Sequence, residues 1–84
     1  MTSKEILKRQ IIYRSTHRGT KEMDLLLGNF VNKNIHQFND IELKELDELM
    51  KIDDEVLQKW YFEKNTDNLI PTNKVSVLLK EFKL

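Results

Sequence analysis

The segment MDLLLGNFV, Met23 to Val31, decides the fold, because its apolar residues recur every three or four positions. This spacing places them along one side of an α-helix, where they can face a core. Gly28 lies inside the segment and costs a helix about 1 kcal/mol relative to alanine. A neighbouring helix that crosses closely at Gly28 would explain this choice. The apolar positions are Met23, Leu26, Leu27, Phe30 and Val31.

Ahead of this segment, the sequence predicts a helix from Ser3 to His17 with a short apolar stripe. Gly19 follows, in the place where a residue in the left-handed conformation ends many helices. Thr20 is expected to cap the next helix, and Glu22 lies in its first turn, where the helix dipole favours an acid. The stripe consists of Ile6, Leu7 and Ile11.

Behind the segment, Asn39 and Glu42 have the spacing of a capping box, which predicts the start of a third helix. Asp53 is expected to cap a short fourth helix, and Trp60 on that helix is expected in the core because of the large area it buries. The third helix would bury Leu43, Leu46, Leu49 and Met50.

The end of the chain predicts a loop over residues 65–71, followed by a fifth helix capped by Thr72. Two glycines and one proline in 84 residues leave few sites for tight turns, and strand-like alternation is absent. We therefore expect an all-α fold, a compact five-helix bundle in which residues 1–84 form one domain.

Several chemistries are excluded or disfavoured. No cysteine is present, which rules out disulfides and thiolate ligation of metals. Ser15 and His17 are two residues apart and point in different directions on a helix. His17 and His36 lie on separate elements without acidic neighbours at ligand spacing, so no metal site is predicted. No catalytic residue is predicted, and no apolar run is long enough to span a membrane.

Charge is segregated although the net charge is zero. Residues 1–22 carry six basic and two acidic side chains, whereas residues 40–55 carry eight acidic and two basic ones. The acidic stretch is expected to be a solvated face. A balanced dipolar surface suits a protein partner better than nucleic acid. A small nucleic-acid-binding regulator that uses the basic first helix remains the alternative.

Residues 14–30, RSTHRGTKEMDLLLGNF, resemble the signature of the succinate dehydrogenase assembly factor 2 family, whose bacterial members are FAD assembly factors. Arg18, Gly19 and Glu22 match the R-G-x-x-E motif of that family. Further along, the family's D-x-x-L-x-x-W spacing recurs. The matching residues there are Asp54, Leu57 and Trp60.

The resemblance implies a five-helix bundle that helps the flavoprotein subunit of succinate dehydrogenase, and often of fumarate reductase, acquire a covalent histidyl–FAD bond. It implies no enzymatic activity and no FAD held stably by this chain. Arg18, Gly19 and Glu22 would form the docking surface on the partner. The surface would continue along the first helix through Arg9, Tyr13, Arg14 and His17.

The basic amino terminus lacks the features of a signal or transit peptide, so a bacterial cytoplasmic location is expected, or the mitochondrial matrix for a processed form. Nothing in the sequence demands a dimer, and a monomer is expected.

Overall fold

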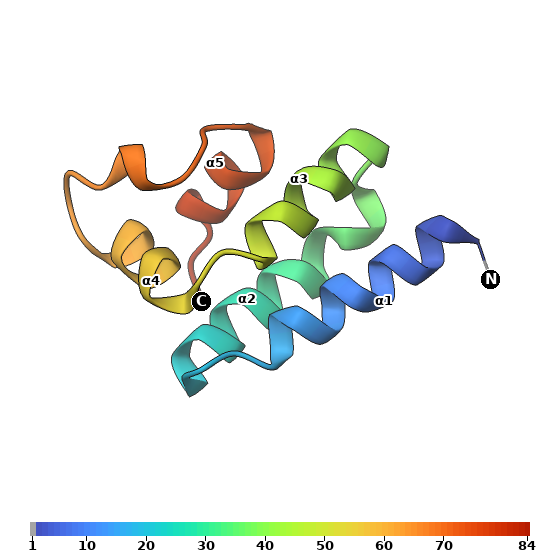
Figure 1. The fold of residues 1–84 in the computed structure, drawn as a ribbon, viewed down its shortest axis with the longest axis horizontal. Coiled ribbons are helices and arrows are strands. Elements are labelled where there is room, and N and C mark those ends of the chain that lie inside the picture. The colour runs from blue at the N-terminus through green and yellow to red at the C-terminus, as the bar shows by residue number, and fades with distance from the viewer. Residues whose placement is uncertain (1) are drawn as a thin grey trace.

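The computed structural model describes residues 2–84, and within this range the chain is helical without a β-strand (Figure 1). The predicted all-α class and the five helices are confirmed. Two single-turn 3₁₀ helices, η1 (Ile35–Gln37) and η2 (Asp67–Leu69), lie in the connections. The α-helices are α1 (Ser3–Thr16), α2 (Lys21–Asn34), α3 (Asp40–Met50), α4 (Asp54–Phe62) and α5 (Lys74–Glu81).

Helices α1 and α2 run antiparallel beside each other, and α1 also packs against α3, which in turn packs against α5 (Figure 1). A Cβ atom at Gly28 of α2 would lie 3.4 Å from Cγ2 of Thr16 and 4.0 Å from the carbonyl oxygen of Ser15. Both atoms belong to the end of α1. The end of α1 therefore crosses α2 at Gly28 as predicted, but it leaves room for a Cβ atom, so the crossing does not by itself require glycine.

The apolar face of α2 forms the centre of the core, as predicted, and each of its five residues is at most 2% exposed. Trp60 of α4 is 5% exposed, so its predicted place in the core is also confirmed. The stripe expected on α1 is less complete, because Ile6 is 44% exposed and Leu7 is half-buried, while Ile11 is fully buried.

The helix starts agree with the sequence at three places. Thr20 accepts a hydrogen bond from the backbone N–H of Met23, and Asn39 and Glu42 form the expected capping box. Asp53 precedes α4 as expected, but its side chain forms no capping hydrogen bond.

Thr72 is not the cap of the fifth helix, and this prediction is wrong. Asn73 occupies the cap position, where its side chain accepts a hydrogen bond from the backbone N–H of Ser76 at 2.8 Å. The hydroxyl of Ser76 accepts one in return from the backbone N–H of Asn73 at 2.9 Å. This reciprocal pair satisfies two backbone donors at once, and it places the first helical residue at Lys74.

The acidic stretch is not a solvated face throughout, and this prediction is wrong at Glu42, Asp47 and Asp54, the last of which pairs with Arg18 at 2.6 Å. Glu42 is 7% exposed and pairs with Lys74 at 2.8 Å, which links α3 to α5. The Asp47 side chain is 13% exposed and pairs with Arg14 of α1 at 2.8 Å. Lys74 and the backbone N–H of Asn39 lower the pKa of Glu42, and the carboxylate raises the pKa of Lys74 in return. These acids therefore join helices.

Candidate functional site: the Arg18–Gly19 turn

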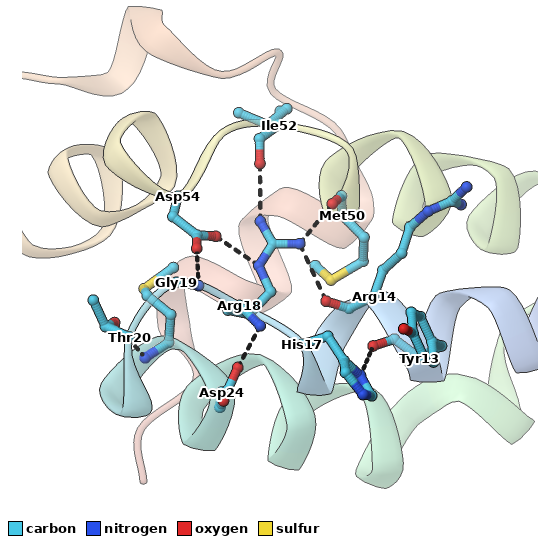
Figure 2. A network of polar contacts seen from close by, with 11 residues as sticks. Tyr13, Arg14, His17, Arg18, Gly19, Thr20, Asp24, Met50, Ile52 and Asp54 are labelled. Carbon is cyan, nitrogen blue, oxygen red and sulfur yellow. Dashed lines mark hydrogen bonds and ion pairs between the residues drawn. The ribbon is translucent and has the colours of Figure 1, made fainter.

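Arg18 and Gly19 of the R-G-x-x-E motif lie where the chain turns from α1 into α2, beside the start of α4 (Figure 2). Glu22 follows in the first turn of α2. Helix α1 ends at Thr16 and α2 begins at Lys21, so Arg18 and Gly19 form the middle of the connection. The two residues have different environments, since the Arg18 side chain is 8% exposed while Gly19 is exposed.

The Arg18 guanidinium points inward and donates hydrogen bonds to its own chain (Figure 2). Its Nε donates to Oδ1 of Asp54 at 2.6 Å. Its Nη1 donates to the carbonyl oxygens of Met50 at 2.7 Å and Arg14 at 3.3 Å, and its Nη2 donates to that of Ile52 at 2.9 Å. Arg18 thus shapes the turn from within and does not present a free guanidinium to solvent.

The acceptors explain why an arginine suits this position. The carbonyls of Arg14 and Met50 belong to the last turns of α1 and α3, where carbonyl groups have no partner inside their own helix. Helix C-termini also carry partial negative charge, which favours a cation. The planar guanidinium offers five donors in a fixed arrangement, so one side chain can satisfy two helix ends, a loop carbonyl and a carboxylate.

The backbone of the turn is held by two further carboxylate contacts. Asp24, in the first turn of α2, accepts a hydrogen bond from the backbone N–H of Arg18 at 2.6 Å. Asp54, the first residue of α4, accepts one from the backbone N–H of Gly19 through Oδ2. Asp24 falls within residues 14–30, which resemble the family signature, and Asp54 carries the family's D-x-x-L-x-x-W spacing. The resemblance assigns neither aspartate to the docking surface, and only the fold reveals their contacts.

Gly19 is not in the left-handed conformation, because no glycine in residues 2–84 has a positive φ. The capping role predicted for it is therefore wrong. The space around the residue is nevertheless restricted, since a Cβ atom at this position would lie 2.9 Å from Oδ2 of Asp54 and 3.9 Å from its Cγ. Real Cβ atoms do not approach another heavy atom to 2.9 Å, so the neighbouring carboxylate limits position 19.

Three of the predicted residues form a stripe along the exposed side of α1. Arg9, Tyr13 and His17 follow one another at four-residue spacing, which keeps them on one side of the helix. The rings of Tyr13 and His17 stack with centroids 3.8 Å apart and an interplanar angle of 17°. Nδ1 of His17 lies 2.8 Å from the carbonyl oxygen of Tyr13. A carbonyl only accepts, so Nδ1 is the donor of this hydrogen bond.

Arg14 and Glu22 complete the predicted set and differ from each other. The Arg14 side chain is 38% exposed and pairs with Asp47 of α3, which also pairs with Lys51 at 3.1 Å. Glu22 is exposed in the first turn of α2, and its side chain has no hydrogen bond or ion pair to another residue within 2–84. Glu22 is thus available to a partner, while Arg14 is already engaged.

The structure therefore divides the seven predicted residues. Five are exposed and lie near the turn or along α1, namely Arg9, Tyr13, His17, Gly19 and Glu22. Arg14 is half-buried in an ion pair, and the Arg18 guanidinium is inside. No group of three or more potential metal ligands occurs in the described part of the chain. The helices of residues 2–84 include none that is long and apolar enough for a membrane span.

Fold and site together define a small helical bundle whose motif turn is ordered by its own charged side chains. Residues 9–83 match the family described as "Flavinator of succinate dehydrogenase", and the chain belongs to this family. The expected resemblance is thereby confirmed.

Curated relatives carry related names. A Dictyostelium discoideum protein named "Succinate dehydrogenase assembly factor 2, mitochondrial" is 35% identical over 71% of this chain and 43% of its own length. The "FAD assembly factor SdhE" of Acetobacter pasteurianus is 34% identical over 66% of this chain and 50% of its own length. The chain thus spans half or less of the length of these relatives. No solved structure matches the chain significantly.

Proposed function

We propose that this protein binds the flavoprotein subunit of succinate dehydrogenase and promotes covalent attachment of FAD to it. The observation that carries the proposal is the family match over residues 9–83, together with a motif turn that leaves Gly19 and Glu22 exposed. The flavoprotein of fumarate reductase is a second client that we propose for the same docking surface.

The proposed role is orientation of the partner and is not enzymatic. The flavin itself carries the electron chemistry of the bond, and the attacking histidine belongs to the partner. A helper that holds the histidine and the flavin methyl group in a reactive geometry lowers the barrier without supplying an acid or a base. FAD stays with the flavoprotein, and this chain holds none stably.

The ordered turn suits such a role, because a rigid docking element loses little conformational entropy on binding. Carboxylates from α2 and α4 hold its backbone, and Arg18 ties it to the ends of α1 and α3. Glu22 would pair with a basic group of the partner, and Arg9 with an acidic one. In this proposal the protein acts as a monomer on one flavoprotein.

The basic first helix supports nucleic-acid binding poorly. Lys4 pairs with Asp40 at 3.4 Å, Arg14 pairs with Asp47, and the Arg18 guanidinium is enclosed. Half of the six basic residues of the segment are therefore engaged with carboxylates of α3 and α4. Titration of this protein with a generic labelled DNA and RNA, at low and high salt, tests the alternative, which predicts steeply salt-dependent binding.

The test of the proposed function is covalent flavin on the partner. The flavoprotein subunit is expressed with and without this chain, and flavin fluorescence of the denatured subunit is measured in the gel. We expect flavin fluorescence to increase when the wild-type protein is co-expressed, and to increase less when the Glu22→Ala variant takes its place. Glu81→Ala, which removes an exposed glutamate from the last turn of α5, is the matched control and should retain the full gain.

Stability of both variants is measured in parallel, because Glu22 also lies at a helix N-terminus and its loss costs about 0.3–1 kcal/mol of helix-dipole stabilisation. Fluorescence that does not rise when the wild-type chain is present would overturn the proposed function. Fractionation of the native cells tests the bacterial cytoplasmic location, which is part of the same proposal.

A further inference from the structure

Gly19 and Asp54 are 35 residues apart in sequence and in direct contact in the turn. The Asp54 carboxylate accepts from the Gly19 backbone N–H through Oδ2 and from Nε of Arg18 through Oδ1 (Figure 2). One side chain thus holds both residues of the Arg-Gly pair. It does so from the first residue of α4, an element that carries none of the predicted docking residues.

The carboxylate cannot easily move away from position 19. Arg18, its other partner, is fixed by the carbonyls of Arg14, Met50 and Ile52. The Asp54 side chain is itself only 24% exposed. A methyl group at position 19 would lie 2.9 Å from Oδ2, so the carboxylate would have to shift against its contacts with the Gly19 N–H and Arg18.

Two explanations for the glycine in the motif therefore compete. A partner backbone could need the space that a side chain would fill, or the chain's own carboxylate could need it. Gly19 has no positive φ, so conformational freedom is not a third explanation. The geometry of the turn favours the internal explanation, because a Cβ atom at position 19 would meet the Asp54 carboxylate before any partner arrives.

We propose that Asp54 is a positioning residue of the docking turn and that its carboxylate is the reason position 19 must be glycine. The part of this inference that concerns partner binding rests on the proposed function. Asp54 fixes the direction of the Gly19 amide and the place of Arg18. It thereby sets how Gly19 and Glu22 are presented to the flavoprotein.

The experiment is a double-mutant cycle with Gly19→Ala, Asp54→Ala and the double variant, and it measures the Kd for the purified flavoprotein subunit. We expect each single change to weaken binding about tenfold. In the double variant the added methyl group meets no carboxylate, so its affinity should equal that of Asp54→Ala alone. If the two increases in Kd multiply, so that the double variant binds about a hundredfold more weakly, the inference is overturned. Position 19 would then be glycine because the partner needs the space.

Asp53→Ala is the matched control, because it removes the neighbouring exposed carboxylate, which forms no capping hydrogen bond. This variant should bind the flavoprotein like the wild type. Circular dichroism establishes the temperature at which every variant is fully folded, and the Kd values are measured there. A purely structural role of Asp54 would lower the unfolding temperature without changing the Kd of folded chains.

A second readout needs no partner. The amide proton resonance of Gly19 should lie downfield in the wild type, because its acceptor is charged, and should move upfield in Asp54→Asn and Asp54→Ala. If Gly19→Ala unfolds, the double variant should fold again, and a double variant that also unfolds would overturn the inference. If the wild type fails to bind the flavoprotein, the proposed function fails while this readout still decides the role of Asp54.

Discussion

Replacement of Arg18 by methionine should be among the most destabilising single changes in this chain. Methionine keeps much of the apolar length of the side chain but removes the guanidinium. The carboxylate of Asp54 then loses its cation, and the carbonyls of Met50 and Ile52 lose their donor. The variant should lose stability because deletion of one partner of a buried ion pair leaves the other charge uncompensated.

The size of the effect follows from burial. Deletion of one partner of a fully buried pair costs about 3–5 kcal/mol. Asp54 is 24% exposed, so water recovers part of its solvation, and we expect about 3 kcal/mol. For a domain of this size, 1 kcal/mol shifts the melting temperature by about 4–8 °C, so about 3 kcal/mol gives a decrease of roughly 12–24 °C.

Urea unfolding followed by circular dichroism measures the free energy of unfolding, and a thermal melt measures the melting temperature. Arg18→Lys keeps the charge but not the fork of donors, so it should lie between the wild type and Arg18→Met. Arg9→Met is the matched control on the exposed side of α1 and should change stability by less than about 0.5 kcal/mol. If Arg18→Met were no more destabilising than this control, the guanidinium would not organise the turn.

Three further changes test other parts of the structure. Gly28→Ala should stabilise α2 by up to about 1 kcal/mol in urea unfolding, since the added methyl would make ordinary contact at 3.4 Å; a loss of stability would mean that α1 lies closer than described. Asn73→Ala should cost about 1 kcal/mol and Thr72→Ala little, and the reverse order in thermal melts would restore Thr72 as the cap. Lys74 lowers the pKa of Glu42, so the stabilisation from this carboxylate is complete above the ordinary glutamate pKa and is lost as the pH falls toward the lower pKa of the folded state. Glu42→Gln should therefore reduce the loss of stability at acidic pH, measured as the urea midpoint against pH. An unchanged pH dependence would mean that other carboxylates cause this loss.

The helices could be predicted from the sequence because their signals are local. The apolar spacing of residues 23–31 and the capping box at Asn39 each depend on neighbours within one or two turns. The helix start at Lys74 was missed by one position, because Thr72 and Asn73 are both good capping residues. Only the position of Ser76, three residues after Asn73, decides between them.

The candidate site was harder to predict because its contacts are distant in sequence. The motif identifies Arg18 and Glu22 equally well as charged residues near a turn. Only the fold shows that one side chain is enclosed by groups 32 to 36 residues further along while the other faces solvent. In the same way, the motif singles out Gly19, but the contact with Asp54 that we propose as the reason for a glycine there cannot be seen in any local sequence pattern.

The distance between the motif and the groups that hold it has a consequence for protein synthesis. A chain growing on the ribosome completes the motif at Glu22, yet it lacks Met50, Ile52 and Asp54 until about thirty more residues have been added. Before that point, the amide of Gly19 has no carboxylate to fix its direction. A client that recognises the shape of this turn therefore selects finished, folded chains over nascent or truncated ones.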